Sequence, residues 1–103
     1  KMVFSYWYKG TYADRTIRDM DMRFITFEES TVQNIVFQNC NLEGSRFPGT
    51  RLTGCSFEGC NLWGGRFSGA ELTAAVFPAE SVPFLEISAE QLQVIRLDRE
   101  EES

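Results

Sequence analysis

The sequence of 103 residues contains no histidine, and this absence excludes much chemistry. Histidine is the commonest general base and the commonest metal ligand in proteins. Long apolar runs are also missing, because none approaches the roughly 18 residues that a membrane-spanning helix needs. No signal-peptide pattern is visible either. We therefore expect no histidine-based catalysis and no membrane span.

Cysteine and positive charge are both scarce. The three thiols, Cys40, Cys55 and Cys60, cannot all pair within one chain, which favours a reducing compartment, and we expect a cytoplasmic location. Lysine and arginine number 10 against 15 acidic residues, for a net charge of −5. A general nucleic-acid binder needs a basic surface, so no direct nucleic-acid binding is expected.

What the sequence does have is an apolar residue at every fifth position. This period is neither that of a helix, 3.6, nor that of a strand, 2. The centres are Ile17, Met22, Phe27, Val32, Phe37, Leu42, Phe47, Leu52, Phe57, Leu62, Phe67, Leu72 and Phe77. We expect each centre to point inward as part of a core.

The positions around each centre are ordered too. A small residue usually stands two positions before it, and residues two apart on an extended segment face the same way. The exceptions are Arg15, Met20, Ile25 and Ile35, where we expect wider or less regular sides. Two positions after the centre stand Gly44, Gly49, Gly54, Gly59, Gly64 and Gly69, and glycine suits a corner. Each pentapeptide therefore predicts one short side and one bend.

A longer period of 20 residues lies within the period of five. Residues 40–54 match residues 60–74 at nine of fifteen positions. Four sides of five residues make one coil, and such repetition indicates a solenoid whose coils bury their inward faces against one another. Adding 20 predicts the columns Phe37–Phe57–Phe77, Phe27–Phe47–Phe67, Met22–Leu42–Leu62 and Val32–Leu52–Leu72.

Three segments carry a resemblance to a known family. "CNLEG" (40–44), "CNLWG" (60–64) and "AELTA" (70–74) fit the loose consensus A(D/N)LXX, so the chain resembles the pentapeptide-repeat proteins over roughly residues 15–79. The resemblance implies an all-β solenoid, a right-handed quadrilateral β-helix of about four coils. We expect an N-terminal aromatic cap at 1–14, the β-helix at 15–79, and a C-terminal cap helix with an acidic tail at 80–103.

The two ends need covers, because an open solenoid exposes apolar surface and unpaired backbone. The aromatic residues near the start, including Trp7 and Tyr8, form either a strand that covers the N-terminal end or an aromatic docking surface. At the other end, Ser88 and Gln91 have the spacing of a capping box, which predicts a short helix within residues 88–97. A homodimer through this C-terminal segment is possible.

No catalytic, cofactor-binding or metal site is expected. All three cysteines occupy the small inward position, which indicates core packing, and two thiols stacked one coil apart have poor disulfide geometry. The carboxylates Glu28, Glu43, Glu58 and Glu71 point outward singly, on different columns. Asp21, Asn41 and Asn61 form a column whose side chains we expect to bond along the stack or to adjacent backbone. We expect no enzyme and no cofactor, unless a catalytic part lies outside this sequence.

The remaining candidates are surface residues. Trp63 follows its centre directly, so it should point outward, where it either covers a side wall or anchors an interface. Glu43 should lie below Trp63, and Arg66 around the next corner, over Arg46. The favoured function is a non-catalytic protein-interaction or scaffolding module whose partner protein is unknown.

The resemblance also implies an alternative function. The quinolone-resistance relatives resemble duplex DNA in shape and charge, and they protect DNA gyrase by occupying its DNA-binding saddle. Two features weaken this alternative: about four coils make a short rod, and residues 17–77 carry a charge of only −2.

Overall fold

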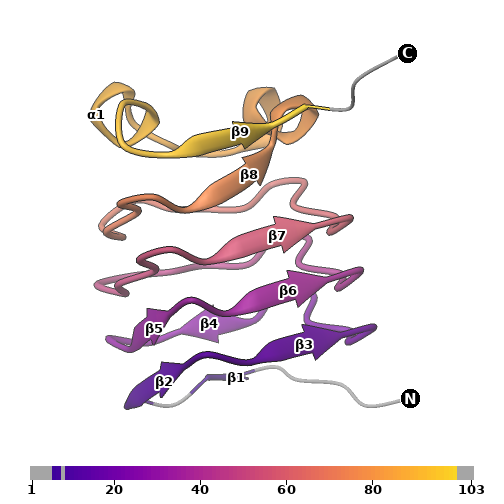
Figure 1. Cartoon of the computed structure of the whole chain (residues 1–103), viewed down its shortest axis with the longest axis vertical. Coiled ribbons are helices and arrows are strands. Elements are labelled where there is room, and N and C mark those ends of the chain that lie inside the picture. The colour runs from indigo at the N-terminus through magenta and orange to yellow at the C-terminus, as the bar shows by residue number, and fades with distance from the viewer. Residues whose placement is uncertain (1–5, 8, 100–103) are drawn as a thin grey trace.

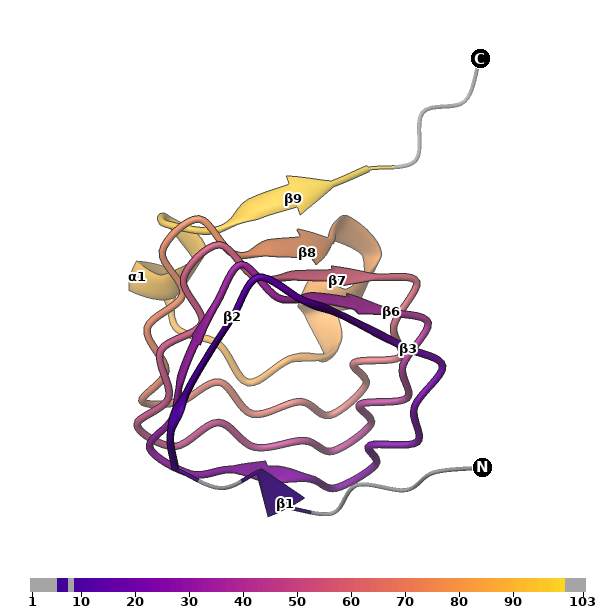
Figure 2. The ribbon, with the colours of Figure 1, turned by 60° about the horizontal axis from the view of Figure 1, so that its bottom comes forward.

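The chain winds through successive turns whose strands lie parallel to one another (Figure 1). The structure, a computed structural model, describes residues 6, 7 and 9–99. The turns follow one outline and enclose a common interior (Figure 2). No helix within this described part is long and apolar enough to cross a membrane.

Short parallel strands make up three sheets of the described chain. The first sheet pairs β1 (Tyr6–Trp7) with β4 (Thr26–Phe27), and the second pairs β2 (Thr11–Ala13) with β5 (Thr31–Gln33). The third has the order β3 (Thr16–Arg18), β6 (Val36–Gln38), β7 (Ser56–Glu58), β8 (Val76–Pro78) and β9 (Arg96–Asp98).

Every paired residue lies 20 positions from its partner. Phe37, for example, lies beside Ile17 on one side and Phe57 on the other. Single bridges continue the same register where no strand is assigned, as between Asn41 and Asn61. The pairs form four columns, at 6-26-46-66-86, 11-31-51-71, 16-36-56-76-96 and 21-41-61. The backbone is therefore a β-solenoid.

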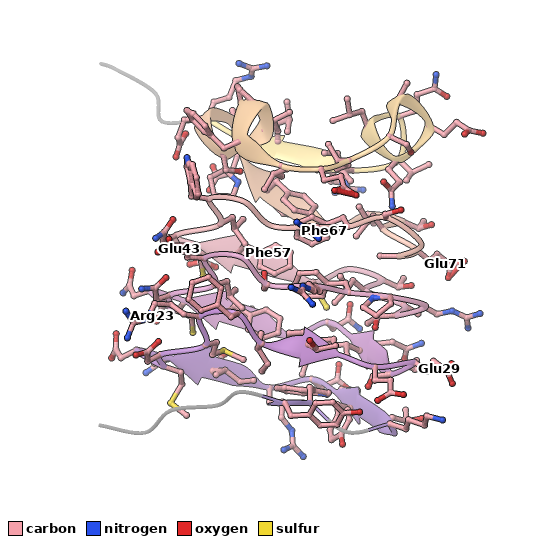
Figure 3. The ribbon with its side chains drawn as sticks, turned by 180° about the vertical axis from the view of Figure 1, so that it is seen from behind. Arg23, Glu29, Glu43, Phe57, Phe67 and Glu71 are labelled. Atoms are coloured by element: carbon pink, nitrogen blue, oxygen red, sulfur yellow. The ribbon has the colours of Figure 1, made fainter. Side chains whose placement is uncertain are left out.

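The repeat centres fill the interior. The ten predicted core residues are all at most 2% exposed: Phe27, Phe37, Leu42, Phe47, Leu52, Phe57, Leu62, Phe67, Leu72 and Phe77. The rings form the two predicted ladders, with centroids 5.3 Å apart for Phe37 and Phe57 and 4.4 Å apart for Phe47 and Phe67 (Figure 3 labels one ring from each ladder). Identical side chains stack on one another because one coil contains 20 residues, which is also the longer period of the sequence.

The corners differ between the two halves of the solenoid. The six predicted corner glycines have positive φ. In the first half the same left-handed conformation falls on Asp14, Asp19, Asn34 and Asn39, residue types that tolerate it, but also on Phe24 and Glu29. Ile25 and Ile35 are buried, and the backbone register there is the same as elsewhere. The expected irregularity of these sides is therefore not seen in the register at Ile25 and Ile35, while at the N-terminal end Arg15 is exposed and Met20 is half-buried.

Both ends continue the coil register. At the start, β1 and β2 pair with the second coil, which fits the interpretation of a covering strand. After the 3₁₀ helix η1 (Ala79–Phe84), the Glu86 amide donates to the Gly65 carbonyl at 2.8 Å. The helix α1 (Ala89–Leu92) begins with the predicted capping box of Ser88 and Gln91. It ends after one turn, and residues 96–98 then form β9 rather than more helix.

Candidate interaction surface

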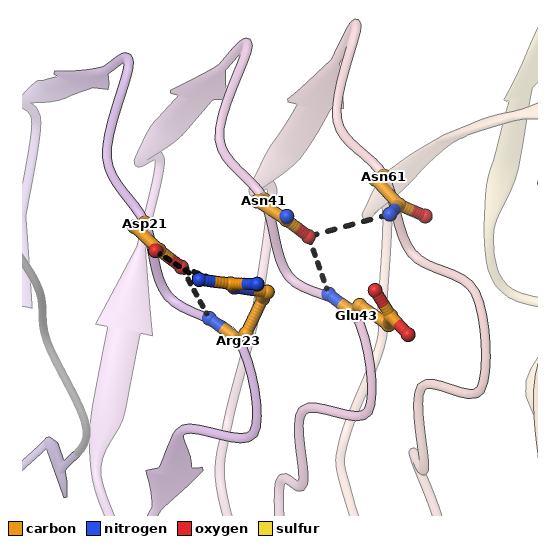
Figure 4. Close-up of polar contacts among 5 residues, drawn as sticks. All are labelled: Asp21, Arg23, Asn41, Glu43 and Asn61. Carbon is orange, nitrogen blue, oxygen red and sulfur yellow. Dashed lines mark hydrogen bonds and ion pairs between the residues drawn. The ribbon is translucent and has the colours of Figure 1, made fainter.

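A ladder of side-chain oxygens shapes one wall of the solenoid. Asn61 donates from Nδ2 to Oδ1 of Asn41 at 3.3 Å, and the same oxygen accepts from the Glu43 amide at 3.2 Å (Figure 4). Asn61 Oδ1 accepts from the Trp63 amide at 3.1 Å in the same way. The predicted structural role of this column is confirmed. Because each of these oxygens holds the backbone amide two residues later, the side chains of residues 23, 43 and 63 point outward from the wall in the same direction.

This outward column holds Arg23, Glu43 and Trp63. Trp63 is 59% exposed, as the sequence indicated. Arg23 donates to both carboxylate oxygens of Asp21, at 2.9 and 2.8 Å, and this hydrogen bonding raises the pKa of Arg23. Figure 3 shows Arg23 and Glu43 on the same side of the solenoid, away from Glu29 and Glu71. The charges of Arg23 and Asp21 are therefore matched within the wall.

The next column, at the corner, was not singled out by the sequence analysis. Its members Phe24, Gly44 and Gly64 all have positive φ, and the amides of Phe24 and Gly44 donate to the carbonyls of Glu43 and Trp63 on the following coils. Gly64 donates instead to the carbonyl of Phe84, the last residue of η1, so Phe84 lies next to Gly64 without sharing its corner conformation. Phe24 is 66% and Phe84 56% exposed. Together with Trp63 they are the three most exposed large apolar side chains in the described chain. Trp63 and Phe84 line one hollow beside Gly64, and Phe24 lies at the same corner two coils earlier. We call Phe24, Gly44, Trp63, Gly64 and Phe84 the corner surface.

Two glycines form the floor of the corner surface. A Cβ on Gly44 would lie 2.6 Å from Cδ1 of Phe24, so the Phe24 ring lies across this glycine. A Cβ on Gly64 would meet only the backbone of Gly44, at 3.9 Å. Gly64 therefore adds no side chain to the corner, where it faces the backbone of Gly44.

Two hollows adjoin this floor. One, of about 540 Å³, is lined by Trp63, Gly64, Arg66, Pro83, Phe84, Leu85 and Glu86. The other, of about 180 Å³, is lined by Arg46, Phe47, Pro48, Arg66, Ser68 and Glu86. Arg66 lies over Arg46 as predicted, since the two are bridge partners, and it borders both hollows.

The two arginines beside the hollows are poorly neutralised. Arg46 has no ion pair with another described residue, and Arg66 Nε lies 4.0 Å from Glu86 Oε2. On another wall, Arg51 Nε lies only 2.7 Å from Glu71 Oε2. The lining of the two hollows thus holds two arginines and one carboxylate, that of Glu86, while Glu43 lies in the column of Trp63 outside both hollows.

The other predicted interaction residues lie elsewhere. Trp7 is half-buried and its ring stacks on Phe27 with centroids 4.8 Å apart, so it extends a core ladder. Tyr8 lies outside the described residues. A hollow of about 520 Å³ at this end is lined by Tyr6, Trp7, Tyr12, Arg15, Thr16, Ile17, Arg18 and Met20.

The thiols belong to the interior. Cys55 Sγ donates to the Val32 carbonyl at 3.2 Å, and burial raises the pKa of Cys55 to about 11. Hydrogen bonding between Cys40 and Cys60 lowers the pKa of Cys40 to about 7 and raises that of Cys60, with burial adding to the latter shift. Within the described part of the chain, no three His, Cys, Asp or Glu residues are grouped so as to hold a metal ion.

Comparison with known proteins agrees with the repeat geometry. The family model of pentapeptide repeats matches eight copies, over residues 21–59 and 50–78. No curated protein is significantly similar to the chain. Since the matched residues cover more than half of the sequence and include the buried centres from Met22 to Phe77, the chain belongs to the pentapeptide-repeat family.

Proposed function

We propose that this chain is a non-catalytic protein-interaction module, built as a right-handed quadrilateral β-helix of about four coils. Partner recognition through a protein surface needs a rigid frame and exposed anchors, and aromatic side chains are the usual anchors. The frame here is a stack of coils whose centres are buried from Met22 to Phe77.

One observation carries the proposal. Of the three most exposed large apolar side chains, Trp63 and Phe84 line one hollow, and Phe24 lies at the same corner two coils earlier. Phe24 is moreover held at φ 61°, a conformation that costs a bulky residue free energy. We infer that this exposed ring, like those of Trp63 and Phe84, is available for contact with another molecule.

The test is capture of partners by the full chain. The protein and four variants, each changed on one wall or corner (Trp63→Ser, Arg51→Gln, Gln38→Ala and Arg66→Gln), are immobilised and exposed to extract of the source cells. We expect at least one protein to be retained stoichiometrically by the wild type and lost in Trp63→Ser. If every retained protein is equally retained by all four variants, the module proposal is wrong.

The alternative of DNA mimicry has weaker support. A DNA-like face needs rows of unpaired carboxylates, whereas Glu71, Glu29 and Asp21 each lie within 3.3 Å of a basic group. Arg46 and Arg66 add positive charge to another wall. A gyrase supercoiling assay at micromolar protein separates the two functions, and we expect no inhibition and no protection against quinolones.

A further inference from the structure

We propose that the corner surface binds an extended acidic peptide segment of a partner protein, through one apolar side chain and one neighbouring carboxylate. The proposal rests on the proposed interaction function and specifies its site and the chemistry of its partner. The apolar side chain lies on Gly64 between Trp63 and Phe84, and the carboxylate pairs with Arg66 and Arg46.

The first step concerns shape. The hollow of about 540 Å³ has a bare backbone floor at Gly64, where an added Cβ would find its nearest neighbour 3.9 Å away. Trp63 and Phe84 line the same hollow and are 59% and 56% exposed. A side chain that enters between them covers apolar surface on two sides at about 25 cal/mol for each Å² buried. An aromatic or long aliphatic side chain fits this requirement.

The second step concerns charge. Arg46 and Arg66 are bridge partners on neighbouring coils, whose backbones lie about 4.8 Å apart, so two positive side chains leave the same wall from adjacent coils and repel each other. The one carboxylate that the structure places near them, Glu86, is 4.0 Å from Arg66 Nε. A second carboxylate relieves this repulsion, and arginine binds carboxylates through paired hydrogen bonds. The partner segment is therefore acidic.

The third step concerns length. The corner surface runs along the stack from Phe24 to Phe84, three coil steps or about 14 Å. An extended chain covers this distance with about four residues. The apolar hollow and the arginine hollow share Arg66 and Glu86, so adjacent residues of one peptide reach both. A short extended segment is therefore long enough for the corner surface, and it can place an apolar side chain in the first hollow and a carboxylate in the second.

The experiment uses the full chain and a fluorescein-labelled peptide, Asp-Glu-Phe-Asp-Glu. Two controls differ in one property each: Lys-Lys-Phe-Lys-Lys reverses the charge, and Asp-Glu-Ala-Asp-Glu removes the ring. We expect fluorescence anisotropy to show saturable binding of the acidic Phe peptide, affinity lower by about tenfold for the Ala peptide, and no binding of the Lys peptide. Amide NMR shifts should centre on Gly64 and Arg66.

Variants test the assignment of roles. Trp63→Ser and Arg66→Gln should each weaken binding by about tenfold. Glu86→Gln should tighten it about threefold, because it removes the competing carboxylate, and a gain of affinity cannot come from misfolding. Arg51→Gln, on another wall, is the matched control and should bind like the wild type. Thermal unfolding of each variant verifies the fold.

The contrary results are equally defined. Equal binding of the acidic and lysine peptides overturns the proposal, as does a shift map centred away from Gly64, or tighter binding of a single-stranded oligonucleotide than of the peptide. If cell-extract partners depend on Trp63 but not on Arg46 or Arg66, the interaction function stands and the acidic-peptide assignment fails. If no retained protein is lost in any of the four variants, the proposed interaction function itself is wrong.

Discussion

The small inward residues do more than leave space for the core. Four of them donate a hydrogen bond to the carbonyl 23 positions earlier: Cys40 to Ile17, Thr50 to Phe27, Cys55 to Val32 and Cys60 to Phe37, at 3.1–3.4 Å. The cysteine thiols and the threonine hydroxyl thus make the same hydrogen bond. Cysteine at these positions is thereby explained without metal or redox chemistry.

Ser45 is the exception among these residues and gives the first prediction. It is fully buried, and its hydroxyl has no hydrogen-bond partner. A buried hydroxyl without a partner costs free energy, so Ser45→Ala should raise the free energy of unfolding by about 1 kcal/mol. Thr50→Val, which removes a hydroxyl bonded at 3.1 Å, should lower it by about 1 kcal/mol. Urea unfolding measures both, and a loss of stability in Ser45→Ala would contradict the assignment.

Cys55 gives a prediction for alkaline pH. Its pKa is raised by burial to about 11, so the folded state favours the neutral thiol. The contribution of this thiol is therefore complete below its unfolded pKa of about 8.5 and is lost as pH rises toward 11, by about 3 kcal/mol. Urea unfolding at pH 7 to 10.5 should show a smaller decline for Cys55→Ala than for the wild type. Parallel curves would show that Cys55 is not buried as a thiol.

At the scale of the element, the corner conformation decides which residues are tolerated. Ala74 has φ 60° and Gly54 has φ 68°, and both occupy one column. Ala74→Gly should stabilise the protein by about 1 kcal/mol, because glycine adopts this conformation without steric cost. Gly54→Ala should destabilise it by more, because the new Cβ would also overlap Oδ1 of Asn34. Thermal unfolding of the pair checks the prediction, which fails if the two shifts share a sign.

The phenylalanine ladders carry most of the packing between coils. Phe57 is 1% exposed, and its ring centroid lies 5.3 Å from that of Phe37 and 5.0 Å from that of Phe77. Phe57→Ala should cost about 3–5 kcal/mol in unfolding free energy, as for buried phenylalanine elsewhere. Phe24→Ala is the control, and its exposed ring should matter by less than about 1 kcal/mol. A loss below about 1 kcal/mol for Phe57→Ala would place its ring outside the core.

At the scale of the whole molecule, periodicity made the interior predictable. Every fifth residue from Met22 to Phe77 is buried because an inward position is defined by its place in the repeat. The same logic placed Trp63 outside and Arg66 over Arg46. The stacking of Asn41 and Asn61 followed from their shared position as well. Burial and register thus depend on spacing alone, which a sequence displays directly.

The candidate site was less predictable. Phe84 lies two positions after Val82, so continuing the frame past Pro78 would have placed it at a corner, beside Trp63. The predicted β-helix ended at residue 79, and Pro78 and Pro83 interrupt the repeat pattern in this segment. The left-handed conformation of Phe24 had no signal, because it arises from the coil geometry against the preference of the residue. The exposed residues of a corner are hard to predict because the coil register imposes a backbone conformation that the residue itself does not favour.

The constant register has a consequence for the order in which the chain assembles. Each segment pairs with the one that ends 20 residues earlier, as Phe57 does with Phe37 and Asn61 with Asn41. During synthesis from the N-terminus, the template for each new coil has therefore already left the ribosome. A repeat array can grow by adding coils at one end, so a new coil does not depend on residues that have not yet been synthesised. The fold is thus suited to vectorial folding, one coil behind the ribosome.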